Sequence, residues 1–134
     1  TTLREVTMGK LKVVFGLGGN RYQENRPLMG KVAARYADEI TVTMDNPRNE
    51  DPAYIASQIV EGITSIGGTP HPPRVILDRE EAVRETLSGS AKDDVVLIAG
   101  KGPETHIIWG ERRIPYNDTQ TVLKWAIDHG LEWR

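Results

Sequence analysis

The sequence contains no cysteine and no long hydrophobic run. The absence of cysteine from all 134 residues excludes disulfides, thiolate zinc sites, iron–sulfur clusters and a cysteine nucleophile, and it is typical of a reducing compartment. The longest apolar runs, such as 95–99, fall far short of the ~20 residues of a membrane span. Residues 1–8 are polar and mixed in charge, unlike a signal peptide, so we expect a cytoplasmic protein without a membrane partner.

The sequence also has no large excess of positive or negative charge. Seventeen Lys and Arg residues stand against 19 Asp and Glu residues, which gives a formal net charge of −2 at pH 7. Nucleic acids and anionic membranes select basic surfaces, so neither is expected as the main partner. The length fits one domain, over residues 1–134, that can bury a core without disulfides or metal. Because the chain starts with Thr1 rather than Met, we expect a fragment of a longer protein.

Short β-branched runs alternate with amphipathic stretches along the chain. The runs predict strands at 11–15, 39–43, 74–77 and 94–99. The amphipathic stretches predict helices at 27–37, between Asp51 and Gly67, at 80–87, and between Asn117 and Gly130. This alternation predicts an α/β fold with a mostly parallel sheet and helices on both faces. Segments 105–109 and 112–116 flank Gly110-Glu111 and predict a hairpin, which would add an antiparallel edge.

Three polar motifs each follow one of the predicted strands. Gly16-Leu-Gly-Gly-Asn-Arg21 follows the first, Asp45-Asn-Pro-Arg48 the second, and Gly100-Lys-Gly-Pro-Glu104 the fourth. The carboxyl ends of parallel strands meet at one edge of the sheet, where open α/β folds bind their ligands. The motifs therefore predict one binding site at that edge.

The first motif is rich in glycine, but it is neither a dinucleotide fingerprint nor a P-loop. Its spacing is G-x-G-G, and the chain holds no G-K-[ST]. The glycines can form a tight strand-to-helix turn without any ligand. Arg21 and Arg26 beside them can instead meet a carboxylate or a phosphate.

The second and third motifs combine a base, acids and an amide. Arg48 can present a bidentate fork to a carboxylate, and Asp45, Asn46 or Glu104 can receive an ammonium group. Lys101 can lie near a phosphate or a carboxylate. The alternative is that the two motifs are a turn and a solvated loop, since Asx residues and proline favour turns by themselves. The sequence offers no metal-binding pattern and no nucleophile elbow.

Taken together, the motifs resemble those of the C-terminal domain of the Mur ligases, and most closely of the members that add diaminopimelate. The matching stretches are 13–21, 26–30, 43–48, 95–102 with Glu104, and 116–118. The resemblance implies a Rossmann-like domain of a three-domain, ATP-dependent ligase of peptidoglycan synthesis. In that family ATP converts a substrate carboxylate into an acyl phosphate, which the incoming amine then attacks.

The resemblance also implies roles for individual residues. Those implied for meso-diaminopimelate binding are Arg21, Asp45, Asn46, Pro47, Arg48, Gly100 and Glu104, with Arg48 on the carboxylate. Those implied for the nucleotide side are Asn20, Asn25, Arg26 and Lys101. The family holds ATP and Mg²⁺ mainly in a central domain and UDP-MurNAc-L-Ala-D-Glu on an N-terminal one. The present domain therefore supplies no catalytic residue and is expected to be inactive alone.

Four positions depart from the usual family pattern. Asn20 and Tyr22 replace two aspartates, Asn25 replaces a lysine, and Pro103 replaces a histidine. The lost charges lie toward the expected nucleotide side. They are the reason to keep, beside the leading interpretation as a ligase domain, the alternative that the chain is a divergent, non-catalytic binding module of the same fold.

Overall fold

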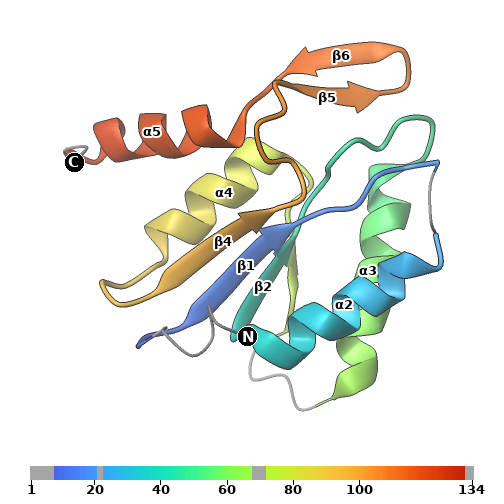
Figure 1. Cartoon of the computed structure of the whole chain (residues 1–134), viewed down its shortest axis with the longest axis horizontal. Coiled ribbons are helices and arrows are strands. Elements are labelled where there is room, and N and C mark those ends of the chain that lie inside the picture. Colours follow the sequence, from blue (N-terminus) through green and yellow to red (C-terminus); the bar gives the residue numbers. More distant parts are fainter. Residues whose placement is uncertain (1–7, 21–22, 68–71, 132–134) are drawn as a thin grey trace.

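The alternation of strands and helices expected from the sequence is present in the computed structural model, which describes residues 8–20, 23–67 and 72–131. Figure 1 shows the path of the chain. Its elements, in order, are β1 (Leu11–Phe15), α2 (Asn25–Tyr36), β2 (Glu39–Val42), α3 (Pro52–Ile66), β3 (Arg74–Val75), α4 (Arg79–Ser88), β4 (Val95–Ala99), β5 (His106–Trp109), β6 (Arg112–Pro115) and α5 (Asp118–Asp128). Within those described ranges, no helix is both long enough and apolar enough to cross a membrane.

Helix starts follow the capping signals in the sequence. The Asp51 side chain accepts a hydrogen bond from the Ala53 backbone N–H at 2.9 Å, and Pro52 occupies the first turn of α3. The Asn117 side chain accepts from the Gln120 N–H at 3.0 Å at the start of α5. Both predicted caps are therefore confirmed.

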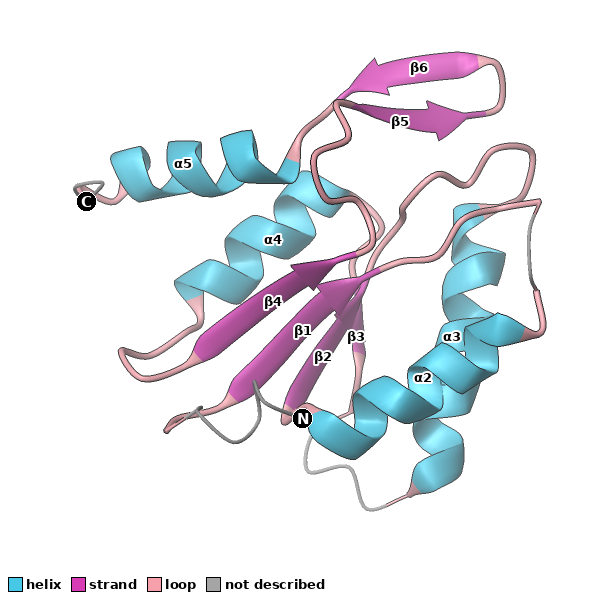
Figure 2. Cartoon of the chain, in the orientation of Figure 1, coloured by secondary structure: helices cyan, strands magenta, loops and turns pink. Residues whose placement is uncertain are grey.

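Four strands form a parallel sheet in the order β3-β2-β1-β4 (Figure 2). In its register Val13 of β1 pairs with Ile40 of β2 on one side and Leu97 of β4 on the other. All three strand pairs are parallel, so the carboxyl ends of the strands share one edge. This confirms the α/β fold and the parallel sheet.

The hairpin of β5 and β6 is antiparallel, as predicted, and Gly110 takes a φ of 62° at its turn. It does not extend the parallel sheet, however, but forms a two-stranded sheet of its own. Positive φ angles at Gly100 and Gly102 turn the chain away from the end of β4. The hairpin lies instead against residues 45–48, where the Arg48 N–H donates to the Ile108 carbonyl at 3.0 Å.

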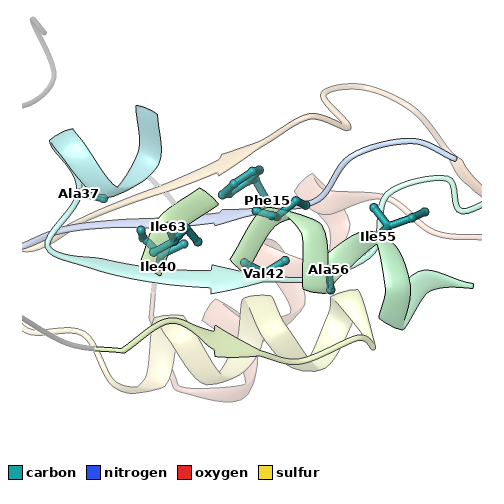
Figure 3. Close-up of a cluster of buried hydrophobic side chains, with 8 residues drawn as sticks. Phe15, Ala37, Ile40, Val42, Ile55, Ala56 and Ile63 are labelled. Atoms are coloured by element: carbon teal, nitrogen blue, oxygen red, sulfur yellow. The ribbon is translucent and has the colours of Figure 1, made fainter. Parts of the chain in front are cut away.

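Helices cover both faces of the sheet, with α2 and α3 on one face and α4 and α5 on the other (Figure 1). The larger core lies against α3, where Phe15 and Val42 of the strands pack with Ile55 and its neighbours (Figure 3). On the opposite face Val14 packs with Ala82 and Val83 of α4. Successive residues of β1 thus serve different cores, as strand geometry requires.

Helix α2 packs differently from what its apolar spacing suggests. Leu28, Val32 and Tyr36 are 39–54% exposed. The helix approaches α3 through Gly30, where an added Cβ would lie 2.2 Å from the Ile59 carbonyl oxygen. The side chains of Val32 and Tyr36 therefore line an open apolar groove of about 290 Å³, together with β1 and β4 residues, instead of being buried.

Candidate functional site

Residues of the three motifs line one pocket at the carboxyl edge of the sheet. The pocket has a volume of about 370 Å³ and is lined by Leu17, Gly18, Asn25, Met29, Asp45, Asn46, Arg48 and Glu104. These residues follow β1, β2 and β4 or begin α2. The structure thus brings the motifs together as the sequence predicts. Arg21, also predicted for this site, and Tyr22 lie outside the described residues.

The buried ammonium group of Lys101 lies at the centre of this cluster. Its Nζ is 2.9 Å from Asn46 Oδ1, 3.3 Å from Asp45 Oδ1 and 3.2 Å from Glu104 Oε1. An ammonium has three donors, and these three oxygens use them. The Lys101 side chain has no exposed surface, so its charge is engaged inside this cluster, and a role toward a nucleotide stays a prediction.

Asn46 connects three segments of the chain. Its Oδ1 accepts from Lys101 and from the Ile108 N–H of β5, the latter at 2.9 Å, and its Nδ2 donates to Glu104 at 3.2 Å. Its side-chain amide is therefore engaged by protein groups. The carboxylates of Asp45 and Glu104 remain as the acceptors that a ligand's ammonium can meet.

The two carboxylates differ in their surroundings. Burial raises the pKa of Asp45, and the charges of Lys101 and Arg79 offset only part of that effect. Desolvation also acts on Glu104, but hydrogen bonds from Asn46 and Lys101, with the charges of Lys101 and Arg48, lower its pKa. Glu104 is 47% exposed, so it is an ionised acceptor that a cation can reach at neutral pH.

Arg48 places its guanidinium against the glycine-rich loop after β1. Its backbone has a φ of 52°, and its Nη1 donates to the Gly19 carbonyl at 2.9 Å. A Cβ at Gly18 would lie 2.7 Å from that Nη1, and one at Gly19 would lie 1.8 Å from the Pro47 oxygen. The glycines of the first motif therefore allow a close approach of the 45–48 segment. The Arg48 side chain lines the pocket together with Asp45 and Glu104.

The backbone conformation at Gly100 and the burial of Pro47 explain why these residue types stand beside the pocket. Gly100 has a φ of 102°, and a Cβ there would lie 3.2 Å from the Gly16 carbonyl oxygen and 3.4 Å from Asp45 Oδ2. Pro47 is fully buried under the glycine-rich loop. Both residues therefore act through backbone geometry and packing beside the pocket rather than through a polar side chain.

Comparison with known proteins assigns the domain to a family. The family described as Mur ligase, glutamate ligase domain, matches residues 1–102. The chain belongs to this family. The resemblance noted in the sequence is therefore confirmed.

Several relatives of this Mur ligase domain are named UDP-N-acetylmuramoyl-L-alanyl-D-glutamate--2,6-diaminopimelate ligase. The protein of Caldanaerobacter subterraneus subsp. tengcongensis is 48% identical over 120 residues, which are 90% of this chain and 24% of that protein. The protein of Rickettsia montanensis is 43% identical over 126 residues, or 92% of this chain and 25% of that protein. A solved structure of a ligase with this name matches with a TM-score of 0.87 and 34% identity, covering 98% of this chain and 26% of that one. The chain thus spans about a quarter of the length of these relatives.

In this Mur ligase domain the predicted nucleotide-side residues lie in different environments. Asn25 lines the pocket. Arg26 is fully buried and donates to Glu50 at 2.7 Å, to Gln58 at 2.6 Å and to the Gly18 carbonyl at 3.2 Å. Its charge is therefore neutralised inside the domain by Glu50, and a role toward a nucleotide stays a prediction.

Glu50 is a residue of this region that sequence reasoning missed. It accepts hydrogen bonds from the Arg26 side chain and from the Asn20 backbone N–H, and these bonds lower its pKa. Glu50 lies two residues beyond the motif that ends at Arg48, but its partners lie 24 and 30 positions away. Only the folded chain shows that this carboxylate joins the glycine-rich loop to the segment after Arg48.

Proposed function

We propose that this chain is the part of a diaminopimelate-adding Mur ligase that binds and positions meso-diaminopimelate. The observation that carries the proposal is one pocket lined by the Arg48 guanidinium and by the carboxylates of Asp45 and Glu104. Such a pocket complements a ligand end that carries both a carboxylate and an ammonium group. The names of the relatives at 43–48% identity support the same choice of amino acid.

The pocket can hold one end of the diamino acid and leave the other end free. Arg48 would pair with the carboxylate of the held end, and Glu104, with Asp45 behind it, would receive the ammonium. Asn46 and Lys101 keep the two acids in place through the contacts described above. The amine of the free end would then be positioned to attack an acyl phosphate. Positioning of this kind lowers a barrier by converting an encounter into an intramolecular step.

ATP, Mg²⁺ and UDP-MurNAc-L-Ala-D-Glu would be bound mainly by the remainder of a longer protein. In the described part of this chain, no group of three or more His, Cys, Asp or Glu residues is arranged to hold a metal ion. The cations Arg26 and Lys101 are also committed to internal ion pairs. The described residues thus form no cluster that would hold Mg²⁺ on its own. We expect the 134-residue chain alone to show no turnover, and the full-length ligase to act in the cytoplasm.

The test is phosphate release by the full-length parent protein with ATP, Mg²⁺ and UDP-MurNAc-L-Ala-D-Glu. meso-Diaminopimelate and L-lysine are compared as the amino acid, because lysine has only one carboxylate: when its α-amine reacts, no carboxylate remains at the end that Arg48 would hold. Turnover with diaminopimelate and little with lysine supports the proposal. Equal turnover with both amino acids would show that Arg48 does not select for a carboxylate at the held end. A folded parent that turns over neither would favour a non-catalytic binding module.

A further inference from the structure

Arg79 is a buried arginine that the proposed binding site does not itself contain. It is the first residue of α4, and its side chain has no exposed surface. Its Nε and Nη2 each donate to the Asp118 carboxylate at 2.9 Å. Its Nη1 donates to the Met44 carbonyl at 3.0 Å, and its Nη2 also donates to the Ala99 carbonyl at 3.1 Å.

The two carbonyl acceptors stand directly before the two loops that line the pocket. Met44 precedes Asp45, and Ala99 precedes Gly100 and the segment that carries Lys101 and Glu104. The Arg79 guanidinium therefore joins the backbone at the start of both loops. A guanidinium can reach two carbonyls and a carboxylate at once because its donors form a planar fork, whereas the compact ammonium of lysine cannot match that geometry.

Asp118 is the ion-pair partner of Arg79. It is the first residue of α5, directly after the hairpin, and the Tyr116 hydroxyl also donates to it, at 2.8 Å. The starts of α4 and α5 both lie at the carboxyl edge of the sheet (Figure 1). The hairpin in turn supplies the Ile108 N–H that Asn46 accepts. The Arg79–Asp118 pair thus connects the start of α5 to the two loops of the pocket that follow β2 and β4.

We propose that Arg79, held by Asp118, is a positioning residue for amino-acid binding. It fixes the spacing between Asp45 on one loop and Glu104 on the other without touching the ligand. The inference rests on the proposed function of the pocket. A buried ion pair contributes little more to stability than a well-packed apolar pair would. The geometric link to two carbonyls is therefore what distinguishes an arginine at this place.

The chain offers a matched control on the same two helices. Arg84 of α4 pairs with Asp128 of α5 at 2.8 Å, but both side chains are 30–45% exposed, and neither lines the pocket. Arg84→Ala thus removes an arginine–aspartate link between α4 and α5 without touching the carbonyls of Met44 and Ala99. Arg79→Lys keeps the charge beside Asp118, and Asp118→Asn keeps the shape while weakening the hold on Arg79.

The experiment measures KM and kcat of the full-length parent and of these three variants. Arg79→Lys and Asp118→Asn are each expected to raise KM for diaminopimelate about tenfold, with KM for ATP and kcat within about twofold of the parent. A purely structural role would instead lower kcat through loss of active enzyme and leave both KM values unchanged. That result, or an equal rise of KM in Arg84→Ala, would overturn the proposal.

A second readout uses the 134-residue chain and does not depend on turnover. Arg79→Lys and Asp118→Asn are expected to shift the amide NMR resonances of residues 45–46, 100–102 and 104, while Arg84→Ala leaves them in place. Unchanged resonances in folded Arg79 and Asp118 variants would contradict the proposal even if one variant of the enzyme failed to fold. Failure of the proposed function would appear differently, as an unmodified parent that does not use diaminopimelate.

Discussion

Lys101 Nζ lies 2.9 Å from Oδ1 of Asn46, a residue 55 positions earlier in the chain. The contact joins the loop after β4 to the loop after β2 and lies under the pocket that both loops line. The Lys101 side chain has no exposed surface, so its charge faces the carboxylates of Asp45 and Glu104, and the Asn46 amide oxygen accepts one of its hydrogen bonds. The acidic half of the pocket is therefore built around an internal cation.

Removing that cation should destabilise the domain. Lys101→Met leaves Asp45, whose side chain is only 13% exposed, without its nearest positive charge. Breaking a buried pair costs about 3–5 kcal/mol of the free energy of unfolding. Lys92→Met removes an exposed lysine instead and should change that free energy by less than about 0.5 kcal/mol. Urea unfolding of both variants of the 134-residue chain measures the difference. Equal stability of the two variants would contradict the central place of Lys101.

Glu50 should make stability depend on pH. Its hydrogen bonds with Arg26 and Asn20 lower its pKa below the ordinary value of 4.5, so the folded state binds its proton less readily than the unfolded state does. The resulting stabilisation is fully present above pH 4.5 and is lost as the pH falls through the lower folded value. Glu50→Gln should remove this part of the acid dependence of the unfolding free energy. Glu61→Gln, at an exposed site on α3, should retain it, and identical curves for the two variants would rule out the effect.

The two glycines beside Arg48 should respond differently to an added methyl group. In Gly18→Ala the new Cβ meets the mobile end of Arg48 at 2.7 Å, so the guanidinium is displaced and KM for diaminopimelate rises with little loss of stability. In Gly19→Ala the Cβ would lie 1.8 Å from the Pro47 backbone oxygen, so the backbone itself must shift and the midpoint of thermal unfolding falls. Steady-state kinetics of the parent and thermal unfolding of the 134-residue chain separate the two outcomes. Similar behaviour of both variants would show that the close approach has no role.

Substitutions of one buried and one exposed apolar residue test which side chains form the core. Ile59 has no exposed surface, and Ile59→Ala should cost about 2–5 kcal/mol of unfolding free energy. Val32 is 50% exposed beside the apolar groove, and Val32→Ala should cost less than about 1 kcal/mol. Both are measured by urea unfolding of the 134-residue chain. Similar costs would mean that α2 covers the sheet more closely than the structure describes.

The sequence was sufficient for the fold because its strong signals are local. The β-branched run at 11–15 coincides with β1, and the caps at Asp51 and Asn117 begin α3 and α5. The convergence of the motifs also followed, since it depends only on the parallel order of the strands. Helical spacing in α2 correctly predicted a helix. It did not show that the apolar residues border a groove, because periodicity identifies a face but not what packs on it.

The ion pairs could not be predicted in the same way. Lys101 stands between two glycines and Arg26 follows the glycine-rich motif, and both patterns equally suit a ligand anion or a carboxylate of the chain itself. Their partners Glu50 and Asp45 are 24 and 56 positions distant, so only the tertiary fold decides between these alternatives. The Arg79–Asp118 pair spans 39 positions and carries no motif of its own. The position of the hairpin, apart from the parallel sheet, could not be predicted either, because the hairpin contacts the backbone of Arg48, a residue distant in sequence.

The central claim is that the pocket binds an amino acid through Arg48, and one kinetic comparison tests it most directly. In the full-length parent, Arg48→Ala should raise KM for meso-diaminopimelate by about tenfold or more, the equivalent of one lost charge-assisted hydrogen bond, while KM for ATP changes little. Arg35→Ala, on the solvent side of α2, should leave both values unchanged. Equal effects of Arg48→Ala on both substrates, or no effect on either, would contradict the account.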